Sequence, residues 1–220
     1  RDHPTALVDA RPDPTSVPLT QQRSWMIAMS QHGVAAVDRV PGLLEALEGV
    51  SLPCQGLKMH VGRRAFTVQE GADGFVVDRN WIIAGMVRHM TGTDAGPERL
   101  QCLWKTKCLY VDPEARTLTV KPEGGPNQEL EYDLLLGCDG IRSVVRNAFL
   151  KDRLFEMELT DCFYWMKSVH VPLPPGLDTQ YVHLMPFAMP NINGIILPEL
   201  NGTANFAGGW AKHQPCAPEL

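Results

Sequence analysis

Residues 134–150, LLLGCDGIRSVVRNAFL, decide the fold of this chain. Three leucines followed by Gly137-Cys138 predict a strand that is buried on both faces. Asp139-Gly140, at the end of that run, is a strong turn signal. Ligands of open α/β sheets bind beyond the carboxyl ends of such strands, where the amides of a following helix attract anions. The stretch therefore predicts an α/β fold with a ligand site at this turn.

A helix is expected directly after the turn. Helical spacing places Val144, Val145 and Phe149 on an inward side. Arg142 and Arg146, four residues apart, are expected to share the outer side. This arrangement predicts a helix that packs on the sheet through its valines and leaves both guanidinium groups in solvent.

Composition limits the classes of protein to consider. The chain has 220 residues, of which 44% are hydrophobic and 20% are charged, as in an ordinary soluble globular protein. The net charge of -5 and the absence of a Lys/Arg run argue against a nucleic-acid partner and against a polybasic membrane patch. No run approaches eighteen apolar residues, so membrane association is not evident.

The cysteines predict no metal centre. Six are scattered along the chain, at Cys54, Cys102, Cys108, Cys138, Cys162 and Cys216. None forms a C-x-x-C pair or has a histidine at metal-ligand spacing. Reduced thiols in an intracellular, reducing compartment are the favoured interpretation, with disulfides as the alternative. His170 and His183 are expected to be hydrogen-bonded strand histidines.

Hydrophobic patterns predict the elements of the amino-terminal part. The expected helices are 30–40, 43–47 and 78 or 79 to about 90. The expected strands are 6–8, 57–61, 64–68 and 74–77, then 100–104, 107–111, 117–121 and 129–133. The strands between 100 and 132 predict an antiparallel meander that leads directly into the buried strand at 134–138.

The composition becomes β-rich after residue 150. Segments 163–171, 179–187, 192–198 and 203–210 each carry aromatic or β-branched residues. We therefore expect a domain at 1–150 that contains the meander and the start of a β-rich domain at 151–220. The predicted class is α/β, a partial Rossmann-type domain followed by part of a β-sheet domain.

CDGIRSVVR resembles the Asp-Gly motif of the FAD-dependent aromatic hydroxylases, the group A flavoprotein monooxygenases that include kynurenine 3-monooxygenase-like proteins. Asp139, Gly140, Ser143 and Arg146 occupy the signature places of that motif. In the family this segment lies near the FAD pyrophosphate and is implicated in binding both FAD and NAD(P)H. The alternative is a plain strand-turn-helix junction of an unrelated α/β protein.

Further segments resemble the same family in the same order. LVDARPD is similar to its ribose-binding strand end, with Asp9 at the acidic position and Arg11 two residues later. RSWMIAMSQHG is similar to the arginine-serine strand, which implies that Arg23 approaches the flavin. VVDRNWIIAGMV is similar to the step that places an arginine, here Arg79, at the flavin diphosphate. Taken singly, these residues could also be a loop aspartate and solvated arginines.

The resemblance implies an NAD(P)H-dependent flavin monooxygenase that hydroxylates a small aromatic substrate with molecular oxygen. The flavin then carries the reactivity, and the catalytic side chains are unknown. Leu57, followed by Lys58, falls where the kynurenine hydroxylases have a substrate-binding arginine, which makes kynurenine doubtful as the substrate. A non-catalytic flavin-fold scaffold and a truncated remnant remain alternatives.

The 220 residues contain neither the Gly-x-Gly-x-x-Gly turn of the family nor its later Gly-Asp motif, and they begin without Met. We therefore expect an inactive fragment of a longer protein.

Overall fold

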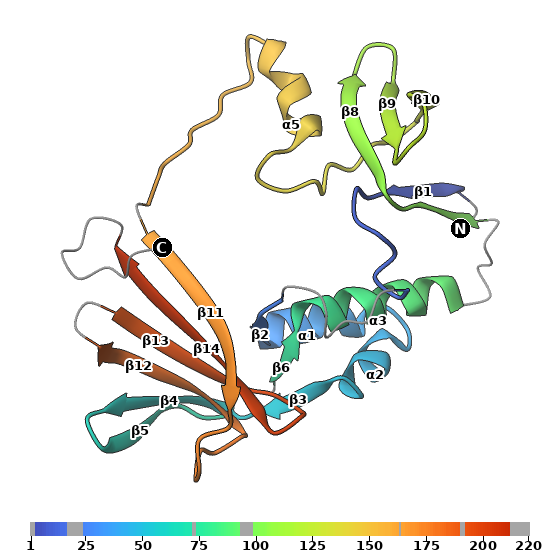
Figure 1. The fold of residues 1–220 in the computed structure, drawn as a ribbon. Helices are drawn as coiled ribbons and strands as arrows, with labels where there is room; N and C mark the ends of the chain where they lie inside the picture. The colour runs from blue at the N-terminus through green and yellow to red at the C-terminus, as the bar shows by residue number, and fades with distance from the viewer. Residues whose placement is uncertain are drawn as a thin grey trace. The chain divides into compact units, whose positions relative to one another are not determined.

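The computed structural model describes residues 3–16, 24–71, 74–92, 99–162, 164–189 and 192–211. The chain divides into two compact units. Unit 1 comprises Arg1–Val17 and Met90–Thr160, and unit 2 comprises Pro18–His89 and Asp161–Leu220. Figure 1 labels the elements of both units.

Among the described residues, unit 1 contains two small sheets and the short helix α5 (Val144–Ala148). Its other elements are β1 (Thr5–Val8), β7 (Leu100–Leu103), β8 (Thr106–Asp112), β9 (Thr117–Pro122), β10 (Gln128–Glu131) and a 3-10 turn at Phe149–Lys151. β8, β9 and β10 form the predicted antiparallel meander. β7 was expected to belong to that meander, but it pairs in parallel with β1 instead.

The strand predicted at 134–138 is wrong. These residues form no strand, and Leu134 and Leu136 are 79% and 75% exposed. A strand needs backbone partners as well as apolar side chains, and within the described part of the chain no strand pairs with this segment. It still lies against α5, because a Cβ at Gly137 would come within 2.8 Å of the Val145 side chain.

The helix predicted after the turn is present as α5. Val144 and Val145 pack inward, as expected. Arg142 is exposed, but Arg146 is only partly exposed, so the two arginines do not share one solvated side. Phe149 lies beyond the end of α5 and is 44% exposed, which corrects the expectation that it faces inward.

Unit 2 is built on a six-stranded sheet and a three-stranded sheet with three helices. The large sheet has the order β11 (Tyr164–Pro172), β14 (Thr203–Ala211), β13 (Ile192–Pro198), β12 (Tyr181–Met189), β4 (Gly56–Val61), β5 (Arg64–Gln69). The small sheet has the order β2 (Met26–Met29), β6 (Gly74–Asp78), β3 (Ser51–Cys54). The helices are α1 (Gln31–Asp38), α2 (Leu43–Glu48) and α3 (Arg79–Gly92). The α/β class predicted from the sequence is confirmed.

The large sheet joins segments from both sides of residue 150. β4 and β12 pair in parallel, with Gly56 opposite Tyr181 and Lys58 opposite His183. These backbone pairs tie residues 56–69 to the β-rich segments after residue 160. The compact units therefore differ from the expected division into 1–150 and 151–220.

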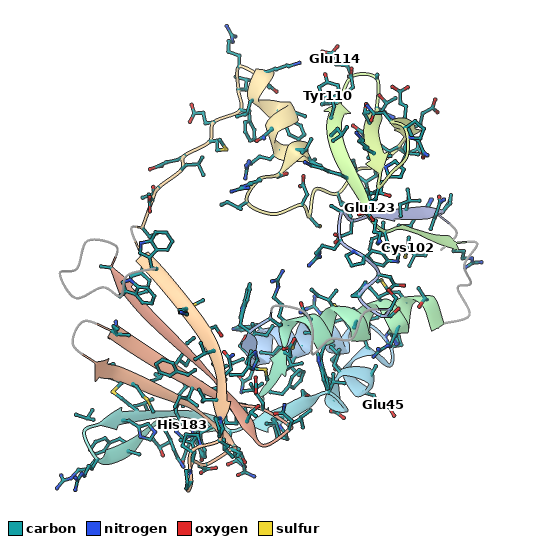
Figure 2. All side chains as sticks on the ribbon, in the orientation of Figure 1. Glu45, Cys102, Tyr110, Glu114, Glu123 and His183 are labelled. Atoms are coloured by element: carbon teal, nitrogen blue, oxygen red, sulfur yellow. The ribbon has the colours of Figure 1, made fainter. Side chains whose placement is uncertain are left out.

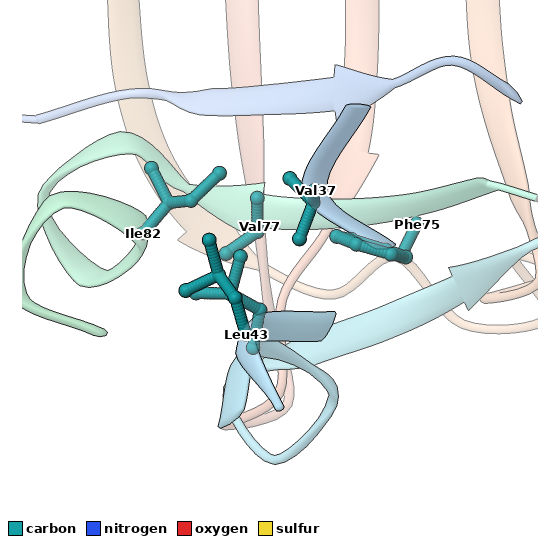
Figure 3. Close-up of a cluster of buried hydrophobic side chains, with 6 residues drawn as sticks. Val37, Leu43, Phe75, Val77 and Ile82 are labelled. Carbon is teal, nitrogen blue, oxygen red and sulfur yellow. The ribbon is translucent and has the colours of Figure 1, made fainter. Parts of the chain in front are cut away.

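Two clusters form the core of unit 2. One lies between the helices and the small sheet, and its buried members are Val37, Leu43, Leu47, Phe75, Val77 and Ile82 (Figure 3). Leu47 and Val77 are fully buried. The second cluster joins one face of the large sheet, through Val182 and Leu197, to Met26 and Val76 of the small sheet. Unit 2 is therefore held together by apolar contacts between its two sheets as well as around its helices.

Candidate nucleotide site

Asp9 follows directly after β1. Its amide donates to the Leu103 carbonyl at 3.1 Å, which fixes the end of the strand on β7. Its carboxylate accepts three hydrogen bonds from Arg11, from the amide at 2.8 Å, Nε at 3.1 Å and Nη2 at 2.8 Å. Partial burial would raise the pKa of the Asp9 carboxyl, but the Arg11 hydrogen bonds and charge hold it below its usual range.

Asp9 still fits its expected role. A carboxylate offers about four lone-pair positions, and Arg11 occupies three of them at Asp9. The remaining position is available to a ribose hydroxyl. Arg11 therefore holds the orientation of the Asp9 carboxylate.

The Asp139 carboxylate caps α5. Oδ1 accepts from the Ser143 hydroxyl at 2.5 Å, and Oδ2 accepts from the Val144 and Val145 amides at 2.6 and 3.3 Å. Burial would raise the pKa of this carboxyl, but the hydrogen bonds from Ser143 and the two amides lower it. Asp139 therefore shapes the turn, and its lone pairs are largely engaged by its own segment.

Gly140 leaves the backbone of this turn open. Its φ of 78° lies in the left-handed region that glycine tolerates best. A Cβ built at this position would meet no atom within 4 Å. A phosphate can approach such a backbone closely, so the turn fits the FAD pyrophosphate expected here.

The two segments share one hydrophobic cluster in unit 1. Val8, the residue before Asp9, packs against the same buried group as Val144 and Val145. The centre of that group is formed by the meander residues Val111, Leu118 and Val120. In addition, burial and the charge of Asp139 both raise the pKa of Cys108 on β8. The structure therefore brings the ribose-type strand end and the Asp-Gly turn onto one core.

Arg79 lies in unit 2, as the first residue of α3. Asp78 caps this helix, because its Oδ1 accepts from the Asn80 amide and the Ser24 hydroxyl, both at 2.7 Å. The Arg79 guanidinium lies 4.5 Å from the centre of the Trp25 ring. The arginine-serine segment and the arginine-led helix are thus neighbours. Arg23, the arginine expected to approach the flavin, lies outside the described residues.

Sequence reasoning missed a polar cluster on the large sheet. His183, labelled in Figure 2, is 2% exposed, and its Nε2 lies 2.8 Å from the Asp178 carbonyl oxygen. Because a carbonyl only accepts, this nitrogen carries the proton, and Nδ1 therefore accepts from His60 Nε2 at 2.8 Å. The expectation of hydrogen-bonded strand histidines is confirmed for His183, and also for His170, which binds Glu199 at 2.7 Å.

Lys58 belongs to the same cluster. Its ammonium lies 2.5 Å from Asp178 Oδ2 and 4.0 Å from the centre of the Tyr181 ring. The alternation of polar and apolar residues in LKMHV and QYVHL was the available sequence signal for this cluster. Only the parallel pairing of β4 with β12 brings the two stretches together. Lys58 is therefore already paired in this structure.

Among the described residues, no group of three or more His, Cys, Asp or Glu side chains could hold a metal ion. The described cysteines, Cys54, Cys102, Cys108, Cys138 and Cys162, are free thiols. None of the described helices is both long and apolar enough to span a membrane.

Comparison with curated proteins gives relatives that include several kynurenine 3-monooxygenases. Kynurenine 3-monooxygenase of Chaetomium globosum is 28% identical over 165 residues, which cover 63% of this chain and 32% of the relative. The enzyme of the same name from Flavobacterium psychrophilum is 23% identical over 206 residues, covering 87% of this chain and 44% of the relative. The chain thus spans less than half the length of these relatives. No family model matches it.

Solved structures share the fold. A mutant of 2-methyl-3-hydroxypyridine-5-carboxylic acid oxygenase matches with a TM-score of 0.69 at 16% identity, covering 96% of this chain and 53% of the other. Klebsiella pneumoniae HpxO complexed with FAD matches with a TM-score of 0.63 at 16% identity, covering 98% and 58%. These findings confirm the resemblance to FAD-dependent aromatic hydroxylases, including kynurenine 3-monooxygenases.

Proposed function

We propose that this chain supplies nucleotide-binding and substrate-domain segments of an FAD-dependent, NAD(P)H-using monooxygenase that hydroxylates a small aromatic molecule with molecular oxygen. The similarity to kynurenine 3-monooxygenases and the fold shared with flavin hydroxylases support this proposal. The observation that carries it is the packing of Val8 and Val145, which flank the two nucleotide motifs, into one cluster. Packing on one core holds the Asp9 strand end and the Gly140 turn in fixed positions, as two motifs that bind one cofactor require.

Each proposed binding residue has a separate task. Asp9 accepts hydrogen bonds from ribose hydroxyls, with its carboxylate held by Arg11. The turn at Gly140 offers open backbone to the pyrophosphate. Arg79 is a diphosphate ligand by resemblance, and its guanidinium can give two parallel hydrogen bonds to a phosphate. Arg23 is an additional candidate by resemblance alone.

FAD, when bound, supplies the electron-transfer and oxygen chemistry of the reaction. The residues of this chain bind and orient the cofactor and the substrate, and they exclude water from them. Val182 and Leu197 pack one face of the large sheet against Met26, and these three side chains are buried from water. We assign no side chain of the chain as a general acid or base.

We also propose that the aromatic substrate is not kynurenine. Leu57 falls where the kynurenine hydroxylases have an arginine, and an apolar side chain cannot bind a carboxylate. The neighbouring cation, Lys58, is paired with Asp178 and lies over Tyr181. An aromatic substrate without an amino-acid carboxylate fits this arrangement better.

The test uses the longest polypeptide expressed from the gene that encodes this chain. NADH and NADPH oxidation is measured with FAD across a panel of phenols, anilines and kynurenine. We expect one phenol or aniline to stimulate oxidation and to yield a hydroxylated product, with kynurenine the weaker stimulator. FAD binding without stimulated oxidation by any compound would instead favour a non-catalytic flavin-fold protein.

A further inference from the structure

Unit 1 contains a cavity of about 500 Å³ beside the Asp-Gly turn, on the side of the segment that precedes α5. Its lining includes Val111, Tyr132, Leu135, Arg146, Phe149 and Phe155. This volume lies within the range of about 300–1,000 Å³ that is typical of small-molecule sites. The FAD contacts proposed above at Asp9 and Gly140 do not use this cavity, although Ser143 and Arg146 of its lining belong to the Asp-Gly motif.

Aromatic rings form part of the wall. Phe149 and Phe155 lie with ring centroids 5.8 Å apart and an interplanar angle of 31°. Tyr132 contributes a third ring, and its hydroxyl donates to the Asp112 carbonyl at 3.4 Å. Flat rings with offset geometry are favourable surfaces for another planar ring. The wall therefore favours an aromatic ligand over an aliphatic one.

Arg146 supplies the cation of the cavity. Its Nη2 donates to the Ile141 carbonyl at 2.8 Å and lies 3.4 Å from the Asn147 side-chain oxygen. Its Nε is buried and has no hydrogen-bond partner within the part of the chain that the structure describes. This nitrogen is out of reach of a ligand in the cavity, but the guanidinium keeps its charge and its Nη1 donors, which can bind an anion.

Asp133 is the acidic residue of the lining. It is exposed, so water and salt weaken its repulsion of a bound anion. Arg146 is the better-placed charge, because it is only partly exposed and its charge is therefore screened less. The balance favours a ligand with one negative group directed at Arg146.

We infer that this cavity is a binding site for a planar aromatic anion, with the ring against Phe149 and Phe155 and the carboxylate or phosphate on Arg146. The site does not depend on FAD or on hydroxylation. Carboxylate and phosphate share the chemistry that a guanidinium recognises, and the probes below separate them.

In the test, the purified 220-residue chain is titrated with each probe. Binding is measured by isothermal titration calorimetry and by changes in the amide chemical shifts in NMR spectra. The ring-bearing anions are benzoate and phenyl phosphate. Benzamide has the ring without the charge, whereas acetate and inorganic phosphate have the charge without the ring. We expect benzoate to bind about tenfold more tightly than benzamide and acetate, or phenyl phosphate to bind about tenfold more tightly than benzamide and inorganic phosphate. This ratio corresponds to one charge-assisted hydrogen bond. The shifted amides should be those of Val145 and Phe149.

Arg146→Gln should weaken this binding by about tenfold or more, while Arg142→Gln, which changes an exposed arginine of the same segment, should leave it unchanged. Asp133→Asn should strengthen it. If Arg146→Gln perturbs the fold, Phe155→Leu removes one ring of the wall and should weaken benzoate more than acetate. Equal binding of benzoate and benzamide, equal effects of the two arginine variants, or no binding of either ring-bearing anion at 10 mM, about ten-thousandfold above a micromolar Kd, would overturn the inference.

Discussion

Val8 and Val145 pack into the same buried cluster, although they are separated by most of the length of unit 1. Val8 immediately precedes Asp9, and Val145 lies in the helix that Asp139 caps. The shared cluster places the two motifs on one core without any direct bond between their carboxylates. The stability of that arrangement and its effect on FAD can be tested separately.

Removing the cap of α5 should destabilise unit 1. Asp139→Ala removes the acceptor for the Ser143 hydroxyl and for two helix amides. We expect a loss of about 1 kcal/mol in the free energy of unfolding, as for other helix caps. Urea denaturation followed by circular dichroism measures it. Asp152→Ala, which changes a loop aspartate of the same unit, is the control, and equal losses in both variants would contradict the capping role.

The same cap should weaken in acid. The folded-state pKa of Asp139 lies below its unfolded value, so its contribution is complete above the ordinary pKa near 3.8 and is lost as pH falls through the folded pKa. Between pH 6 and pH 3, wild type should therefore lose more stability than Asp139→Ala. Parallel pH profiles of the two proteins would contradict this expectation.

His183 should make unit 2 sensitive to a milder acidity. Burial lowers its pKa in the folded state, so the unfolded chain takes up a proton more readily. The contribution of neutral His183 to the free energy of unfolding is complete above the ordinary pKa near 6.5. It decreases as the pH falls from there towards the pKa of the folded state. Thermal unfolding at pH 7.5 and 5.5 should show a larger decrease for wild type than for His183→Gln. His170→Gln, at an exposed histidine, should behave like wild type.

Leu47 should be the most sensitive apolar position of the helical core in unit 2. It is fully buried, and a Cβ at Gly85 would come within 2.7 Å of its Cδ2, so the packing around it is tight. Leu47→Ala should cost about 2–5 kcal/mol in the free energy of unfolding. Leu200→Ala, at a leucine that is 51% exposed, should cost less than about 0.5 kcal/mol. Similar costs for both would show that the core is placed elsewhere.

Much of the fold was predictable because the local hydrophobic pattern of the sequence agrees with the helices and strands that form. The strand β1, the meander of β8, β9 and β10, and the helix α3 follow from alternation, turn residues and helical spacing. Residues 134–138 carry an equally clear apolar pattern but form no strand. Pairing depends on a neighbouring backbone, which no local pattern encodes.

Long-range contacts explain what was missed at the site. The Asp9 and Asp139 motifs were identified from their own residues, and their common core follows from packing that joins Val8 to Val145. The engagement of the Asp139 carboxylate by α5 could have been anticipated, because an aspartate before a helix often caps it. The His60–His183 pair could not, since it requires the parallel registration of two strands more than a hundred residues apart.

The central claim is that Asp9 and the Gly140 turn bind one nucleotide. The most direct measurement is the FAD dissociation constant of the longest expressed polypeptide and of its Asp9→Asn, Gly140→Ala and Gly124→Ala variants, by flavin fluorescence. Gly124 also has a positive φ, at a turn of the meander, and controls for backbone strain. Asp9→Asn and Gly140→Ala should each weaken FAD binding by about tenfold, the value of one charge-assisted hydrogen bond, while Gly124→Ala should not. Unchanged FAD affinity in both site variants would contradict the claim.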